Sequence, residues 1–269
     1  MKASGLAKAG DSNPNPDCYE SLAPYYEEIY ANIDADETVR QWWQLLRESQ
    51  IVTGHPERLR LLDIGCGPGW QLKAWRELGF AVSGVDSSPT LLALARERLG
   101  PLADCVDLYR ANILEPASLP AGMSYDVVVS HFNFLNLFSP EQRERLFMSV
   151  ASLVQPGGVW IADFAEPRSP LEAIEERISV SEGALVRKGE FNSRLGCFEQ
   201  HWEGPAVACH ERYWFGHGAQ ATALASRTGW QLCLRRAWHP YAPDAAWQDP
   251  KDYDEVLVDV YRRLKGGAT

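Results

Sequence analysis

The stretch LLDIGCGPGW, at residues 61–70, holds the residue types in this chain that are best spaced for chemistry. Gly65, Gly67 and Gly69 occupy every second position after an apolar run, and Asp63 stands just before them. A strand that leads through a glycine turn into a helix presents free backbone N–H groups and the positive end of the helix. That geometry suits a nucleotide-like ligand. A carboxylate would repel a pyrophosphate, so Asp63 favours a ligand with a cationic group.

The glycine spacing also departs from the dinucleotide-binding fingerprint G-x-G-x-x-G. Its third glycine would fall at position 70, which is Trp70. A second acid, Asp86, ends the next expected strand, where a carboxylate can accept hydrogen bonds from the hydroxyls of a ribose. A ligand with a ribose, a positively charged amino-acid end and no phosphate agrees with both acids. S-adenosylmethionine (SAM) is such a ligand.

Alternating strands and helices must position this turn. We expect strands at residues 59–64, 80–86, 105–113, 125–132 and 159–164, separated by amphipathic helices. Strands that alternate with helices imply a parallel sheet with right-handed crossovers. The expected fold is therefore α/β, Rossmann-like and doubly wound, with a mostly parallel sheet.

Four segments make up the expected domain organisation. Residues 1–18 form a flexible polar arm, and residues 19–164 and 216–269 form the core, which begins with a helical lid. The core closes with a helix at 218–229, a strand at 230–238 and an acidic helix from Asp252 to Leu264. Residues 165–215 have no helical period and predict a small antiparallel substrate cap, broken at Gly204-Pro205.

Period-two alternation assigns the cap residues to two faces. In one strand Gly196, Phe198, Gln200 and Trp202 lie opposite Cys197, Glu199 and His201; in the next, Ala208, His210, Arg212 and Trp214 lie opposite Cys209, Glu211 and Tyr213. Polar and aromatic residues on both faces indicate that these strands cover something.

The composition of the chain limits the kinds of binding partner that we expect. The chain has 269 residues, a formal net charge of −10 and no lysine-rich run, which disfavours nucleic acid. No apolar run approaches the ~20 residues of a membrane span, and the N-terminal segment has no secretory signal pattern. The six cysteines form no C-x-x-C pair and no zinc spacing, so we expect reduced thiols, no metal and a cytoplasmic protein.

In these motifs the sequence resembles the class I SAM-dependent methyltransferases of small-molecule type. The resemblance rests on LLDIGCGPG, VSGVD closing at Asp86, RANI at 110–113, YDVVVSHF at 125–132 and LVQPGGVWIADF at 153–164, in the expected order. It covers about residues 19–164 and implies a seven-stranded sheet with SAM as cofactor. The helix and strand at 216–238 also match the closing hairpin of the family.

The resemblance also implies roles for particular residues. Asp63 and the backbone of Gly65 and Gly67 would hold the methionine part, Asp86 the ribose, and Ser87 would lie beside the adenine. Asn112 stands where many members have an aspartate that binds the adenine. The full set implied for the cofactor is Tyr26, Asp63, Gly65, Cys66, Gly67, Gly69, Asp86, Ser87, Asn112, Ile113 and Ser130. The segment YESLAPYYEEIY resembles the family's helix that closes over SAM, through Ala23, Tyr26 and Glu27, with Glu in place of Asp.

Methyl transfer is an in-line displacement that depends mainly on positioning and exclusion of water, so no catalytic motif is obligatory. Candidate catalytic residues are His131, His201 and His210. Candidates for binding a small-molecule acceptor (N, O, S or C) are Asn133, Phe134, Arg212, Tyr213 and Trp214; Arg212 could clamp a carboxylate. Two alternatives stay open: a SAM-using non-methylase that cyclises or cleaves SAM, and a non-catalytic SAM-binding protein. The chain is expected to be a monomer or homodimer.

Overall fold

The large sheet of this protein carries the site. The structure is a computed structural model that describes residues 16–115, 118–167, 171–238 and 256–265. Seven strands lie in the order β10-β11-β5-β4-β1-β2-β3. They are β1 (Arg60–Ile64), β2 (Ala81–Asp86), β3 (Asp107–Arg110), β4 (Tyr125–Ser130), β5 (Val154–Ala165), β10 (Trp230–Trp238) and β11 (Val256–Arg263). β11 is antiparallel to both of its neighbours. The expected doubly wound, mostly parallel fold is confirmed.

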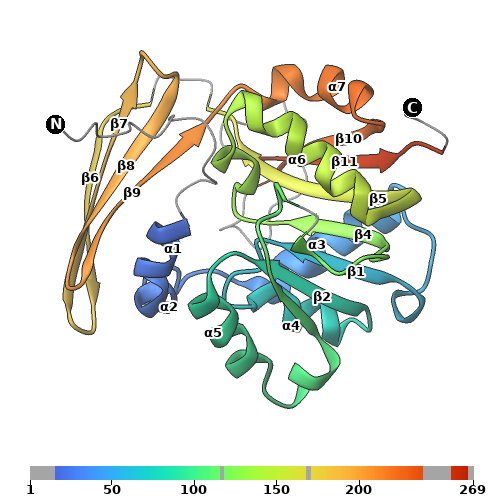
Figure 1. Cartoon of the computed structure of the whole chain (residues 1–269), viewed down its shortest axis with the longest axis horizontal. Coiled ribbons are helices and arrows are strands. Elements are labelled where there is room, and N and C mark those ends of the chain that lie inside the picture. The colour runs from blue at the N-terminus through green and yellow to red at the C-terminus, as the bar shows by residue number, and fades with distance from the viewer. Residues whose placement is uncertain (1–15, 116–117, 168–170, 239–255, 266–269) are drawn as a thin grey trace, which may run out of the picture.

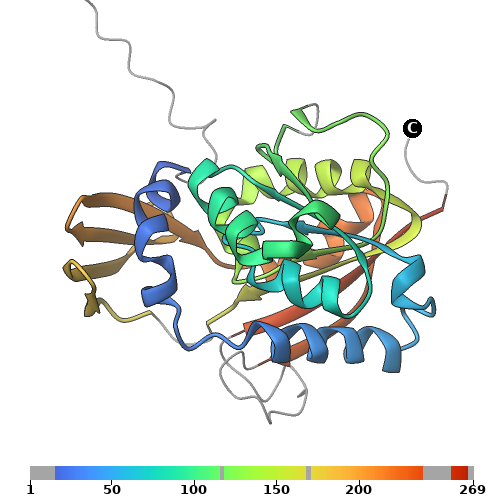
Figure 2. The same cartoon turned by 90° about the horizontal axis from the view of Figure 1, so that it is seen from below.

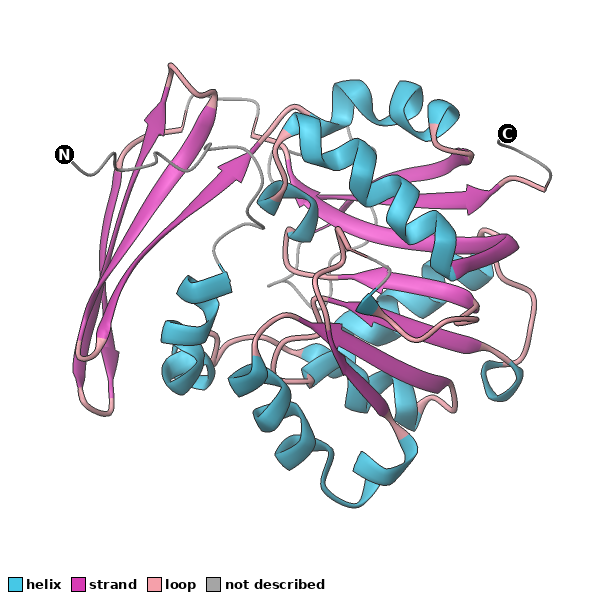
Figure 3. Ribbon diagram, viewed as in Figure 1, coloured by secondary structure: helices cyan, strands magenta, loops and turns pink. Residues whose placement is uncertain are grey.

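Helices cover both faces of this sheet (Figure 3). On one face α3 (Ala35–Glu48), α4 (Trp70–Glu77) and α5 (Pro89–Leu99) bury an apolar cluster. On the other face lie α6 (Pro140–Leu153) and α7 (His217–Arg227). Three of these helices have a side-chain cap at their start: Asp34, Ser88 and Ser139 each accept a backbone N–H from the first turn of α3, α5 and α6.

A second sheet forms the cap. It is antiparallel, in the order β6 (Ile174–Val180), β7 (Gly183–Asn192), β8 (Cys197–Gly204) and β9 (Val207–Trp214). Two short helices, α1 (Pro16–Leu22) and α2 (Tyr26–Ile29), lie between the cap and the large sheet in both views (Figures 1 and 2). Leu22 of α1 packs against Trp202 of β8, so this face of the cap is its inner face.

Buried polar side chains attach the cap to the core. The Asn136 side-chain amide donates to the carbonyl oxygens of Ala165 and Trp214, each at 2.9 Å, at the exit of β5 and the end of β9. Arg143 of α6 donates to the Trp214 carbonyl as well, at 2.5 Å. Both ends of the cap are therefore fixed at the same point of the core.

The expected acidic helix at 252–264 is wrong for its described part, because Val256–Arg263 is strand β11. Val256, Val258 and Val260 alternate with other residues, as in a strand. Asp259, the acid in the described part of this segment, is fully buried and paired with Arg235 of β10 at 2.6 Å. Residues 252–255 lie outside the described part of the chain.

The expectation of six reduced thiols is also wrong. Cys18 of α1 and Cys209 of β9 form a disulfide across 191 positions, while Cys66, Cys105, Cys197 and Cys233 are free. The bond joins a lid helix to the inner face of the cap. Residues 16–18, which the sequence assigned to a flexible arm, form the first turn of α1, and residues 1–15 lie outside the described chain.

None of the helices that the structure describes is long and apolar enough to span a membrane.

Candidate active site

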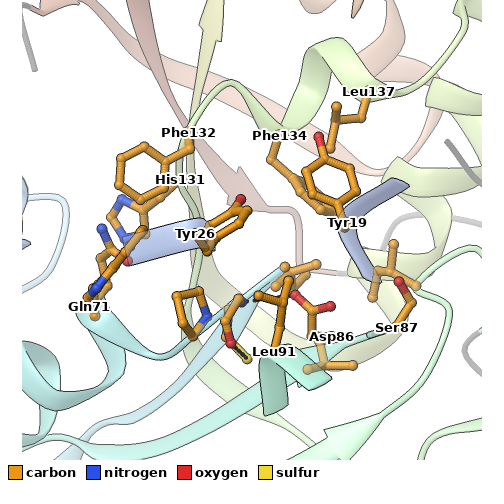
Figure 4. Close-up of a pocket in the computed structure, with 18 of the residues that line it drawn as sticks. Tyr19, Tyr26, Gln71, Asp86, Ser87, Leu91, His131, Phe132, Phe134 and Leu137 are labelled. Atoms are coloured by element: carbon orange, nitrogen blue, oxygen red, sulfur yellow. Dashed lines mark hydrogen bonds between the residues drawn. The ribbon is translucent and has the colours of Figure 1, made fainter. Parts of the chain in front are cut away.

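A pocket opens at the carboxyl ends of β1, β2 and β4. It encloses about 830 Å³, counting open solvent at its mouth. Figure 4 shows Tyr19 and Tyr26 of the lid, Asp86 and Ser87 after β2, and Phe132 and Phe134 after β4 around this cavity. The described lining also includes Ile64, Gly65, Cys66, Gly67, Pro68, Trp70, Gln71, Val85, Leu91, Ala111, Ile113, His131, Leu137 and Phe138.

The glycine turn forms one wall of the pocket. The backbone N–H groups of Gly65 and Cys66 donate to the Val85 carbonyl at 2.8 and 3.1 Å, which fixes the turn against β2. Gly65 has φ of +71° and lets the Phe134 ring approach closely. A Cβ at this position would lie only 2.5 Å from the nearest ring atom. Gly67 has φ of +52° and open space at its Cβ position, so the backbone itself faces the cavity.

Asp86 joins this turn to α5. One carboxylate oxygen accepts the Gly67 N–H and the other accepts the Ser88 N–H, both at 2.9 Å. Burial raises the pKa of Asp86, although these bonds oppose the shift. Each oxygen keeps a further acceptor site, so Asp86 can also accept from a ligand hydroxyl.

Two other acids lie deeper. Asp63 is 1% exposed, its Oδ2 has no hydrogen-bond partner, and burial raises its pKa well above the ordinary value. Asp163 of β5 accepts the backbone N–H groups of Phe132 and Asn133 at 3.1 and 2.7 Å, and burial raises its pKa to about 7. Phe132 and Asn133 both have positive φ, so Asp163 holds a left-handed turn that directs Phe132 into the pocket. Sequence reasoning missed Asp163, although it is an acid at the end of an expected strand.

The lid closes over the glycine turn through aromatic contacts. The Tyr26 ring stacks on Trp70, with centroids 5.6 Å apart. Glu27 accepts the Trp70 indole N–H at 3.4 Å and pairs with Arg98, which itself donates to the Pro68 carbonyl at 3.0 Å. Trp70, where the dinucleotide fingerprint has glycine, therefore supports the lid.

A second contact holds the lid to α5. Glu20 of α1 accepts the Ser88 hydroxyl at 2.5 Å and the Thr90 backbone N–H at 3.3 Å. The hydrogen bonds from Ser88 and Thr90 lower the pKa of Glu20, and burial opposes them.

His131 lines the pocket, but its low affinity for a proton makes it a poor general base. Burial lowers its pKa to about 3. Its ring stacks on Trp42 at 4.0 Å, and its Nε2 receives the Trp75 indole N–H at 3.4 Å. The ring is thus neutral with its proton on Nδ1, a buried atom without a hydrogen-bond partner.

His201, His210 and Arg212 lie on the outer face of the cap, opposite Trp202 and Cys209. Arg212 donates to Glu199 at 2.8 Å, His210 lies 3.5 Å from the same carboxylate, and the Asn192 and Arg212 bonds lower the pKa of Glu199 to about 2. None of these three residues is in the described lining of the pocket, because strand alternation turns their side chains to the other face of the cap. The catalytic roles of His201 and His210 and the carboxylate clamp by Arg212 stay predictions. Tyr213 lies on the inner face.

The other expected residues lie behind the wall of the pocket. Ser130 accepts the Trp160 indole N–H at 2.8 Å, and Asn112 Oδ1 accepts the Leu114 N–H at 3.0 Å. Gly69 caps the start of α4. A Cβ added to Gly69 would lie 2.9 Å from the Cβ of Ala95. Asp63 and Asn133 are likewise outside the described lining, and Trp214 contributes its carbonyl to the Asn136 and Arg143 bonds.

The residues present fit SAM. The buried Asp63 oxygen lacks a partner, the Gly67 backbone is open to the cavity, and Asp86 has acceptor capacity left. A ligand with a cation and a ribose but no phosphate matches this set. The fold and the site thus define the class: SAM-binding enzymes with a Rossmann-like sheet.

One family model matches part of the chain. Residues 61–158 match the family described as "Methyltransferase domain". This part of the chain is therefore similar to a methyltransferase domain, and SAM is the cofactor that the residues of the pocket fit.

Sequence relatives cover part of the chain. A ubiquinone biosynthesis O-methyltransferase of Brucella ovis is 36% identical over 104 residues, which are 38% of this chain and 40% of that protein. The chain spans 40% to 56% of the length of the first curated relatives it matches.

Solved structures share the fold over most of the chain. The CcbJ methyltransferase from Streptomyces caelestis has a TM-score of 0.69 at 19% identity, over 92% of this chain and 98% of that one. CalS10, an amino pentose methyltransferase from Micromonospora echinaspora solved with SAM bound, has a TM-score of 0.64 at 18% identity, over 89% and 96%.

Proposed function

We propose that the protein transfers the methyl group of SAM to a small-molecule acceptor that enters between the lid helices and the cap. The observation that carries this proposal is the shared pocket: lid residues Tyr19 and Tyr26 and the cofactor wall of Gly65, Gly67 and Asp86 line one cavity. When bound, SAM supplies an electrophilic methyl group on a good leaving group.

The chain's own residues contribute positioning and exclusion of water. Asp86 and the Gly67 backbone hold the ribose side, and Asp63 supplies a negative charge behind the turn. The Tyr26–Trp70 stack shields the cavity from solvent. The neutral His131 orients the acceptor by donating from Nδ1 rather than by accepting a proton. The segment 165–215 acts as the substrate cap.

Product analysis tests this proposal against the alternatives. Purified protein is incubated with SAM, with and without a mixed pool of small amines, alcohols, thiols and acids, and products are followed by mass spectrometry. We expect S-adenosylhomocysteine and one methylated pool member, and neither without the pool. Methylthioadenosine or a cyclised product formed from SAM alone would contradict methyl transfer. SAM binding without any product in either arm would indicate a non-catalytic binding protein.

A further inference from the structure

Two buried oxygen atoms on the inner face of the cap lack hydrogen-bond partners. Gln200 of β8 and Glu211 of β9 are directly paired in the strand register, and Oε1 of Gln200 and Oε2 of Glu211 are both buried and unpartnered. Side chains paired in this way stand about 5 Å apart at their Cβ atoms. Buried acceptors without donors are costly, so two of them side by side indicate a site for a ligand that donates.

The Glu211 carboxylate is held in place on its other side. It is 3% exposed, and its Oε1 accepts the Trp202 indole N–H at 2.8 Å. Burial raises the pKa of Glu211, and hydrogen bonds from Trp202, Tyr19 and Tyr213 oppose this shift. Oε2 nevertheless has no partner of good hydrogen-bond geometry.

Tyr19 connects this carboxylate to the pocket. It stands on α1, lines the cavity that Asp86 lines and acts on Glu211 by hydrogen bonding (Figure 4). Tyr213 on β9 and Tyr26 on α2 lie near enough to Tyr19 to raise its pKa, after the larger effects of burial and Glu211. Glu211 is not among the described lining residues; it lies behind Tyr19, the side chain that separates it from the cavity, at the junction of lid and cap.

The groups around Glu211 do not neutralise its carboxylate, so its negative charge can act on a ligand. Among the largest influences on its pKa is one cation, Arg187 of β7. Arg187 lies over the Trp202 ring at 5.4 Å and forms an ion pair with Glu176 at 2.5 Å. Tyr19 and Tyr213 are neutral, because burial raises the pKa of each hydroxyl well above its ordinary value.

We propose that Gln200 and Glu211 bind an amino group of the acceptor, so that the protein acts on small molecules that carry a primary or secondary amine. This inference rests on the function proposed above and names its substrate class. A protonated amine has at least two N–H donors, enough for both oxygens, and its charge complements the carboxylate. A hydroxyl offers one donor and no charge, and a carboxylic acid is repelled.

Matched pairs of compounds test the proposal. Benzylamine and benzyl alcohol, cyclohexylamine and cyclohexanol, and glucosamine and glucose are added to the full chain loaded with S-adenosylhomocysteine, and binding is followed by thermal shift and titration. At least one amine is expected to bind about tenfold or more tightly than its alcohol partner. Glu211→Gln should abolish this preference, since it keeps an acceptor for Trp202 and removes the charge.

Glu199→Gln is the matched control, because Glu199 is on β8 and faces outward to Arg212; it should keep the amine preference. Affinity for SAM, measured by calorimetry on the same proteins before S-adenosylhomocysteine is added, separates the two proposals: a wild type that does not bind SAM would refute the function, not this site. Amines that bind no better than alcohols, or a preference that persists in Glu211→Gln, would overturn the inference. A Glu211→Gln protein that does not bind SAM is replaced by Gln200→Leu, for which the same loss is expected.

Discussion

Replacement of Gly65 by alanine tests how the glycine turn shapes the pocket. Two effects add at this position. A side chain at φ of +71° costs about 1–2 kcal/mol of left-handed strain. The new Cβ would also lie 2.5 Å and 2.7 Å from two atoms of the Phe134 ring, so the ring must move, and overpacking of this kind costs about 1–3 kcal/mol. The free energy of unfolding should therefore fall by about 2–5 kcal/mol.

Phe134 has little room to move except into the cavity. It packs edge-on against Phe138 at 5.0 Å, and both rings line the pocket. Displacement of the ring should occupy ligand space, so Gly65→Ala should weaken SAM binding as well as stability.

Gly196→Ala supplies the matched control. Gly196 has φ of +73° in the turn before β8, with nothing within 4 Å of its Cβ position, so it should lose only the ~1–2 kcal/mol of backbone strain. Urea unfolding and SAM calorimetry are run on both variants. Equal stability losses in both, with SAM affinity unchanged in Gly65→Ala, would refute the argument.

Two further predictions concern protonation and the lid. Burial lowers the pKa of His131 from 6.5 to about 3, so its contribution to the free energy of unfolding is complete above pH 6.5 and is lost as the pH falls toward 3. Between pH 7.5 and 5 this loss is about 2 kcal/mol, and urea unfolding of His131→Phe should show a pH dependence smaller by that amount; identical pH dependence would argue against a buried neutral imidazole. For the disulfide, the unfolded chain should titrate four thiols before reduction and six after it. Reduction, like Cys18→Ser with Cys209→Ser, should lower the free energy of unfolding by about 2–4 kcal/mol, and six thiols without reductant would rule the bond out.

Local patterns were sufficient for most of the fold. The strand, glycine turn and helix at 60–77 carry their own periodicity and stop signals. Strand β11 was missed because it contains a buried acid, Asp259. Its partner, Arg235, lies on another strand and is too far along the sequence to be found from the residues around Asp259. The Cys18–Cys209 bond spans 191 positions and has no local signal either.

The site was predictable on its cofactor side and much less so on its acceptor side. Asp86, Gly65 and Gly67 lie where the motif indicates. Alternation correctly placed Glu211 and Tyr213 on one face of β9 and His210 and Arg212 on the other. Which face turns inward depends on packing against α1, which the sequence of the strand does not encode.

The measurement closest to the central claim is a calorimetric titration of SAM into the wild type and Asp86→Ala. The account predicts one SAM bound per chain, displaced by S-adenosylhomocysteine and not by NAD, with markedly weaker binding in Asp86→Ala, because the ribose hydroxyls lose their acceptor. No binding of SAM to the wild type, or equal affinity in the two proteins, would contradict it.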